Sequence, residues 1–432
     1  MTAIDLDFRS ALAFWFQLGW ISFGGPAGQV AIMHRELVEQ RRWISEGRFL
    51  HALNYCMVLP GPEAQQLATY IGWLLHGVRG GIAAGVLFVL PSLAILTTLA
   101  WTYLQYGSVP VVAAALYGMK AAVVAIVALA IYRLSRRVLK TRPLRFIAIA
   151  ALMLVAVLKI SFPLVILAAA VLGWVIHGLW PNSLAAPSDA GQSGATALDD
   201  STAPIYSRRR LITIAMIGLT LWGLALCVLW AMFGWNGALT QMAWFFSKAA
   251  LVTFGGAYAV LPYVQEASVD QFQWLTATQF VDGLALGETT PGPLIMIVTY
   301  IGFVGAWTHE VFGPNALLTA GVLGALVATF FTFLPSFLFI LVGAPLVEST
   351  RNNLRVAAPL LAVSAAVVGV MANFGLFLAR HVFWIEGQGS SGGVDGYAVA
   401  IAAVACLALI RMHLVWVLLG CALLGLGRSA LL

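Results

Sequence analysis

Long apolar runs constrain this chain more than any other feature of its sequence. A helix of about 20 apolar residues crosses the roughly 30 Å hydrocarbon core of a bilayer. Runs of that length cover residues 81–103, 109–132, 211–233 and 316–342. Only 9% of the residues are charged and 61% are hydrophobic, whereas soluble domains usually carry about 25% charged residues. The sequence therefore predicts an all-α polytopic integral membrane protein.

Several functional classes are excluded by what the composition lacks. The net charge of +6 is spread over loops between apolar helices and forms no basic face for nucleic acid. The 4 cysteines and 7 histidines show no metal-ligand spacing, so we expect neither a metal nor a cofactor. No nucleophile with a nearby base and no nucleotide-binding loop is visible. We therefore predict no catalytic residues and no enzyme. The acidic start of the chain argues against a cleavable signal.

The chain contains an internal duplication. Residues 23–62 and 254–293 share eleven identities in forty positions when aligned without gaps at an offset of 231. A Phe-Gly-Gly motif and a Pro-Gly-Pro triplet stand at equivalent places in both copies. After an insertion the offset becomes 244, which aligns Lys120 with Ser364. Shared apolar composition does not explain matches in such rare triplets, so we interpret them as a true repeat.

The duplication divides the chain into four predicted parts. We expect a first repeat at 1–180, a flexible cytoplasmic linker at 181–210, a connecting transmembrane helix at 211–236 and a second repeat at 237–432. The linker is rich in Ser, Ala, Gly and Asp, which is typical of flexible segments. One additional crossing between two copies turns the second upside down, which is the inverted-repeat pattern of many secondary transporters.

Basic residues predict which loops face the cytoplasm. Loops 33–48 and 133–145 and the linker 181–210 carry clusters of Arg and Lys, and the positive-inside rule places such loops in the cytoplasm. The second-copy counterpart of residues 34–48, at 265–279, contains no Lys or Arg. The equivalent elements are therefore expected on opposite sides of a membrane that the chain crosses several times.

Four helix breaks mark the predicted binding site. Inside a bilayer an interrupted helix is tolerated only where protein or water satisfies its backbone, and a restarting helix directs free N–H groups and a positive dipole end into that space. Such a site favours an anion. Packing kinks are the alternative, but four breaks at equivalent positions argue against it. The break residues predicted to bind substrate are Gly24, Gly25, Pro60, Gly61, Pro62, Gly255, Gly256, Pro291, Gly292 and Pro293.

Polar side chains near the breaks complete the predicted site. Gln65 and Gln66 follow Pro62 directly and donate hydrogen bonds without carrying charge. For residues 49–76 we favour a re-entrant hairpin over a single kinked crossing.

Ionisable side chains within apolar sequence form a second group of candidates. Lys120 lies deep in a predicted helix, where a charge costs at least about 2.5 kcal/mol, and Lys248 is a second buried cation. We predict that both bind substrate; a structural ion pair is the alternative for Lys120. Glu63 and Glu288 are candidates either for a coupling proton or for partners of these lysines.

The break motifs resemble those of the chromate ion transporter family. The resemblance rests on Phe23-Gly-Gly-Pro26, the run from His51 to Gly72, and the second-copy motifs Phe254-Gly-Gly and Thr290-Pro-Gly-Pro293. It covers both halves and is similar to the long, two-domain bacterial form. Membership implies an inner-membrane carrier that exports chromate and confers chromate resistance, with sulfate as the related oxyanion. The second copy departs from the family pattern, since it has Tyr258 where many relatives have His.

Other functions fit parts of the same pattern. Sulfate or general oxyanion transport is one alternative, because chromate and sulfate are both tetrahedral dianions. A lipid-phosphate flippase is another, since helix breaks also suit a phosphate headgroup. The expected partners are chromate, sulfate and the lipid bilayer, together with a second copy of the chain in a homodimer. Alternating access at a midplane site between the repeats is the mechanism that we expect.

Overall fold

The structure is a computed structural model that describes residues 7–179, 208–254, 256–349, 357–384 and 393–431. In these residues helices dominate, and one isolated bridge joins Trp384 to Val394. Within these described ranges, five helices are long and apolar enough to cross a membrane: α4, α5, α8, α13 and α14. The prediction of an all-α, multi-pass membrane protein is therefore confirmed.

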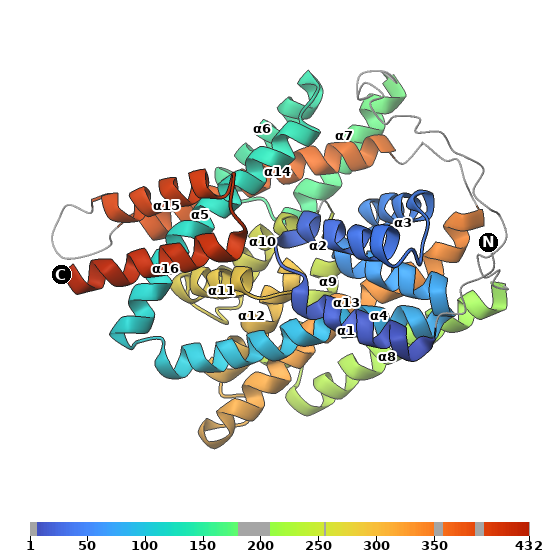
Figure 1. The fold of residues 1–432 in the computed structure, drawn as a ribbon, viewed down its shortest axis with the longest axis horizontal. Helices are drawn as coiled ribbons and strands as arrows, with labels where there is room; N and C mark the ends of the chain where they lie inside the picture. The colour runs from blue at the N-terminus through green and yellow to red at the C-terminus, as the bar shows by residue number, and fades with distance from the viewer. Residues whose placement is uncertain (1–6, 180–207, 255, 350–356, 385–392, 432) are drawn as a thin grey trace.

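The first half, up to residue 179, begins with short helices and continues with longer ones (Figure 1). Its elements are α1 (Phe8–Ile21), α2 (Gly25–His34), the π-helical η1 (Arg35–Gln40), α3 (Glu46–Val58), α4 (Glu63–Tyr106), α5 (Pro110–Val138), α6 (Arg142–Ala156) and α7 (Phe162–Leu179).

The second half, from residue 238, has a similar order of elements. These are α9 (Ala238–Val252), α10 (Ala257–Gln265), the π-helical η2 (Glu266–Gln271), α11 (Ala277–Thr289), the 3-10 helix η3 (Leu294–Met296), α12 (Ile297–Thr308), η4 (Pro314–Ala316), α13 (Leu317–Ser349), α14 (Ala357–Phe383), α15 (Gly396–Ala408) and α16 (Leu414–Leu431).

Helix bounds follow the sequence offset closely. Both η2 and α11 begin and end 231 positions after η1 and α3. The breaks expected from the Gly-Gly and Pro-Gly-Pro motifs fall between α1 and α2, between α3 and α4, and at the corresponding places of the second half. The inverted orientation of the two halves in a bilayer stays a prediction.

Helix α4 is two packed segments joined by a sharp reversal. His76 and Gly77 leave the helical region, with φ of −137° and 63°. Residues 69–73 then lie against residues 80–85, and a Cβ at Gly72 or Gly80 would collide with the backbone of the other. Gly302 and Gly324 make the same close approach between α12 and α13. Glycine is required here because the two backbones touch.

The two halves exchange helices. In the first half α6 and α7 pack against α14 of the second half, while α15 and α16 pack against α5 of the first half. Figure 1 shows α15 and α16 flanking α5 at one end of the molecule, and α1 and α8 toward the other. The long helices α4 and α13 also pack on each other. Both halves therefore contribute to every part of the core.

Helix α8 (Arg208–Phe233) is the element without a counterpart. It packs on α13 and α9, and Leu211, Gly218 and Leu229 are its buried residues. Many of its large apolar side chains are exposed, as expected of a lipid-facing helix. The basic residues 208–210 form its first turn, whereas residues 181–207 of the predicted linker lie outside the described residues.

Candidate transport site

The two Pro-Gly-Pro breaks are each bound by the opposite half. The Gly61 N–H donates to the carbonyl oxygen of Thr253 at 2.8 Å, and the Gly292 N–H donates to that of Ser22 at 2.7 Å. Ser22 and Thr253 are themselves equivalent, and each hydroxyl donates to its own helix. Breaks that are far apart in sequence are therefore brought together in pairs, as a shared site requires.

Glycine is necessary at the centre of both triplets. Gly61 and Gly292 have φ of 127° and 103°, a backbone region that side chains rarely adopt. A Cβ at Gly61 would collide with Gln66 and Ser336, and one at Gly292 would collide with Ser92. The Ser92 hydroxyl donates to the Pro291 carbonyl oxygen. Helix α4 of the first half therefore closes over the second break, and α13 of the second half closes over the first.

The start of α4 is buried and polar. Gln66 Nε2 donates to the Pro60 carbonyl oxygen at 2.7 Å, and Gln65 Nε2 donates to Thr69 Oγ1 at 3.0 Å. Both glutamines are fully buried, and each amide nitrogen has a second hydrogen. No side chain caps this helix start. A buried start without a cap leaves first-turn N–H groups available to a ligand, and their dipole favours a negative charge.

Gln29 is a polar residue of the site that the sequence analysis missed. It lies on α2, is fully buried, and its Nε2 donates to the carbonyl oxygens of Gly292 and Ser22. A glutamine one turn after the Phe-Gly-Gly motif was the signal available in the sequence. Ser92 and Ser336, which also contact the breaks, stand in Pro-Ser pairs that align at the offset of 244, and this repetition was the signal available for them.

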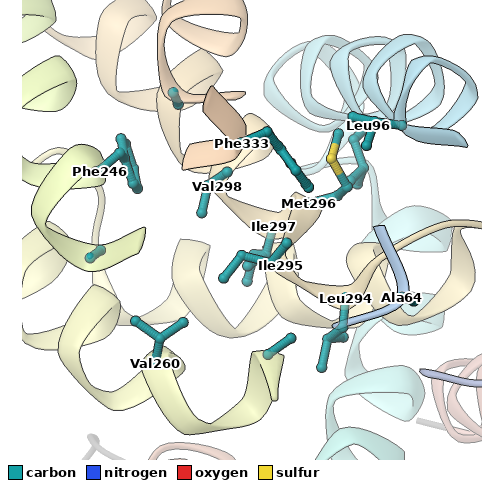
Figure 2. Close-up of a cluster of buried hydrophobic side chains, with 14 of the residues drawn as sticks. Ala64, Leu96, Phe246, Val260, Leu294, Ile295, Met296, Ile297, Val298 and Phe333 are labelled. Atoms are coloured by element: carbon teal, nitrogen blue, oxygen red, sulfur yellow. The ribbon is translucent and has the colours of Figure 1, made fainter. Parts of the chain in front are cut away.

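The second break restarts in an apolar environment. After Pro293 the chain continues through Leu294–Met296 into α12, and these residues are buried. Figure 2 shows the side chains of residues 294–298 among Leu96, Val260 and Phe333, with Ala64 of α4 beside Leu294. The two restarts therefore lie side by side, but only the first presents polar side chains.

The Phe-Gly-Gly breaks differ in how far they are covered. Gly24 and Gly25 have positive φ, and no neighbouring atom lies within 4 Å of the position that a Cβ would occupy at Gly25. Gly256 also has a positive φ but is buried. Gly255 lies outside the described residues.

The two candidate carboxylates face other groups than the lysines. Glu63 points at the start of α10, where its Oε1 lies 3.9 Å from the position that a Cβ would occupy at Gly256, and the Arg137 guanidinium interacts with it electrostatically. Glu288 is buried and its Oε1 accepts a 2.9 Å hydrogen bond from the Tyr258 hydroxyl. Tyr258, which departs from the family pattern, therefore has a defined partner.

Lys120 pairs with a carboxylate that the sequence analysis did not name. Its Nζ lies 3.1 Å from Asp282 Oδ1, and the two side chains are 23% and 5% exposed. The Tyr103 hydroxyl donates to Asp282 Oδ2 at 2.9 Å. The structure thus has the ion pair that was the alternative interpretation of Lys120, and its partner comes from the other half. Asp282 stands among apolar residues, which was the signal available for it.

Lys248 lies elsewhere on α9. Its ammonium is 5.7 Å from the centre of the Trp244 ring, in a cluster where Trp244 packs near Trp222 of α8. No described contact links Lys248 to a Pro-Gly-Pro break, so the structure does not bring it together with Gln65 and Gln66.

These features define a class of protein. It is a multi-pass α-helical membrane protein in which interrupted helices of two exchanged halves meet in the core. Comparison with known sequences then identifies the family: the chromate transporter family model matches residues 10–174 and 240–426. The chain belongs to the chromate transporter family.

Three relatives resemble the chain over most of its length. The chromate transport protein of Cupriavidus metallidurans is 30% identical over 381 residues, which cover 88% of this chain and 84% of the relative. The probable chromate transport protein of Synechococcus elongatus is 31% identical, with 85% and 84% covered. The chromate transport protein of Pseudomonas aeruginosa is 31% identical, with 87% and 82% covered. No solved structure matches the chain.

Proposed function

We propose that this protein is a secondary transporter that exports chromate from the cytoplasm across the bacterial inner membrane and thereby gives chromate resistance. Two relatives are named as chromate transport proteins, which supports chromate as the substrate; the direction, the membrane and the resistance are part of the proposal. The observation that carries it is that each Pro-Gly-Pro break is hydrogen-bonded to a helix end of the other half: the Gly61 N–H donates to the Thr253 carbonyl oxygen, and the Gly292 N–H donates to that of Ser22.

The proposed substrate site lies at the start of α4. A tetrahedral dianion there would accept hydrogen bonds from first-turn N–H groups and from the amides of Gln65 and Gln66, with the helix dipole favouring its charge. The remaining break residues hold the two halves in register around it. Glu63 is directed at the start of α10, where that helix's dipole favours its negative charge.

Arg137 supports entry from the cytoplasmic side. It belongs to the basic loop 133–145 that the positive-inside rule assigns to the cytoplasm, its guanidinium contacts Met57 Sδ at 3.7 Å near the end of α3, and it interacts with Glu63 next to the break. An exposed cation at this position would raise the local concentration of an anionic substrate.

The membrane potential supplies enough energy for export. Moving a dianion out of an interior-negative cell lowers its free energy by about 4.6 kcal/mol at 100 mV, since each charge contributes about 2.3 kcal/mol. The proposal therefore requires no coupled proton. Alternating access would carry the substrate through the site by exposing it first to one side and then to the other.

Chromate uptake into everted membrane vesicles tests the proposal. Vesicles with and without the chain are energised by a membrane potential alone, and sulfate is added as a competitor. We expect potential-driven chromate accumulation only in vesicles that contain the chain. No chromate movement in well-energised vesicles would contradict the proposal, and sulfate accumulation in the same vesicles would redirect it to sulfate. Collapse of uptake with the pH gradient alone would contradict the proposed energy source.

A further inference from the structure

Helices α3 and α11 are equivalent in sequence but differ in burial. Each contains 13 residues, of which 3 are buried in α3 and 8 in α11. A difference this large between aligned helices of equal length means that one of them is docked against a surface that the other does not reach. The asymmetry therefore concerns the position of the helix and not its secondary structure.

The docked helix is α11. It packs against α5, α14 and α16, and α10 before it packs against α14. In the order of elements, α2 and α3 correspond to α10 and α11, and α14, α5 and α7 correspond to α5, α14 and α16. If the two halves packed in the same way, α2 and α3 would therefore contact α14, α5 and α7. Within the described residues, α2 and α3 have no comparable interface with those helices. The burial of the aligned glycines agrees, since Gly256 is buried while Gly25 is half-buried.

A stripe on α3 marks the undocked face. Leu50, Asn54 and Val58 follow one another at four-residue intervals and therefore lie on one side of the helix; all three are exposed. The aligned residues of α11 are Val281, Ala285 and Thr289. The first two are buried and the third is half-buried. Among the described residues, the face that α11 uses for docking is thus left exposed on α3.

An ion pair fastens the docked helix. Asp282 of α11 meets Lys120 of α5 at 3.1 Å, and Tyr103 holds the second carboxylate oxygen. The aligned positions hold His51 on α3 and Ser364 on α14. The Ser364 hydroxyl donates to the Leu360 carbonyl oxygen of its own helix. Opposite charges are therefore present at only one of the two equivalent contacts.

We propose that the Lys120–Asp282 pair is the latch of a gate formed by α10 and α11, and that α2 and α3 form the opposite gate, which is open in this structure. In transport the latch opens, α10–α11 leaves α5, and α2–α3 docks through the stripe of Leu50, Asn54 and Val58. The inference rests on the proposed alternating-access function. It gives Asp282 a positioning role, since it acts through Lys120 and α11 and does not contact the substrate.

Cysteine labelling at two aligned positions tests the latch. Asn54→Cys and Ala285→Cys are introduced separately into a chain whose native cysteines, Cys56, Cys227, Cys406 and Cys421, are replaced by Ser or Ala. A membrane-impermeant maleimide is applied to intact cells and to inverted vesicles. With the latch intact we expect N54C to be labelled in inverted vesicles and A285C to be protected from both sides. Failure of N54C to react on either side would overturn the proposal, because the stripe would then face lipid.

The latch is then removed by the double change Lys120→Met and Asp282→Leu, which leaves no unpaired buried charge. We expect A285C to react at least about tenfold faster in intact cells and N54C to react more slowly, as a shift between two states requires. Unchanged labelling at both positions would overturn the proposal. The matched control removes another ion pair of 3.1 Å, by Arg428→Met with Asp395→Asn, and should leave A285C protected.

A charge exchange separates a latch from a purely structural contact. Lys120→Asp with Asp282→Lys restores opposite charges, and we expect it to restore protection of A285C; a variant that folds and remains unprotected would contradict the latch. Labelling requires no substrate, so failure of the latch and failure of the proposed function are distinguishable. Labelling that changes as expected without chromate uptake would support the latch and contradict the substrate. Chromate uptake with unchanged labelling would support the substrate and contradict the latch.

Discussion

The two Pro-Gly-Pro breaks share a backbone geometry and differ in the side chains that follow it. Both central glycines have positive φ, and both donate their N–H to a helix end of the opposite half. After the first break the chain continues as Glu63-Ala-Gln-Gln66, whereas after the second it continues as Leu294-Ile-Met-Ile297. One break is therefore equipped to bind a polar ligand and the other to pack in the core.

This difference suggests what each half of the transporter has to keep if the two halves are repeats. The backbone crossing has to be preserved twice, because each break completes the hydrogen bonds of the other half. The polar side chains follow only the first break, where we propose that a single small anion binds. The apolar restart, visible in Figure 2 as a packed cluster around Leu294, gives the polar restart a rigid neighbour.

Adding a methyl group at either central glycine should have the largest effect. Gly61→Ala and Gly292→Ala each introduce backbone strain of about 1–3 kcal/mol and overpacking of about 1–3 kcal/mol. We expect both variants to lose most of their folded protein, measured as the monodisperse fraction after detergent extraction and size-exclusion chromatography. The two losses should be similar, because the two breaks share their geometry.

Gly234→Ala is the matched control. Gly234 also has a positive φ, of 71°, but no neighbouring atom lies within 4 Å of the position that a Cβ would occupy. The strain then acts without the collision, and we expect a clearly smaller loss. If Gly234→Ala were as damaging as Gly61→Ala, the close approach of the two halves would not be the reason that residue 61 has to be glycine.

Replacing a glutamine at the first break should affect transport more than stability. Gln66→Leu removes the donor to the Pro60 carbonyl oxygen, which leaves a buried acceptor unpaired at about 1–3 kcal/mol, and it removes a proposed substrate donor. We expect the initial rate of chromate uptake into everted vesicles to fall about tenfold or more, since about 1.4 kcal/mol corresponds to a factor of ten. The aligned change Ile297→Leu should leave uptake within about twofold. Equal losses in both variants would show that the two restarts do not differ in role.

The sequence predicted the backbone of this site better than its contacts. Glycine and proline restrict the backbone locally, so the breaks at residues 60–62 and 291–293 could be placed from the residues alone. Pairing depends on packing between helices that are distant in the sequence. Lys120 was therefore recognised as unusual, while its partner Asp282 and the donor Gln29 were not. Lys248 was grouped with the site because the sequence does not reveal which face of α9 it occupies.

Removing the cation beside the first break should have a moderate effect. Arg137→Ala deletes an exposed guanidinium that interacts with Glu63, and we expect the apparent KM for chromate to rise about three- to tenfold with little change in the maximal rate. The increase should shrink at high salt, because salt screens exposed charges. Arg136→Ala, at an exposed neighbouring arginine, is the control. A similar KM increase in both variants would assign the effect to the net charge of the loop.

The smallest effect is expected at the two helix ends that receive the glycine N–H groups. Ser22→Ala and Thr253→Val each remove one hydroxyl that donates within its own helix, while the carbonyl oxygens that accept from Gly292 and Gly61 remain. A hydrogen bond of this kind is worth about 0.5–1.5 kcal/mol, so the melting temperature in detergent should fall by a few degrees, equally in both variants. Because the main-chain bonds are retained, chromate uptake should stay near that of the unchanged protein. A large loss of uptake in Ser22→Ala alone would mean that this hydroxyl contacts the substrate, and the polar site would then extend from α4 to the end of α1.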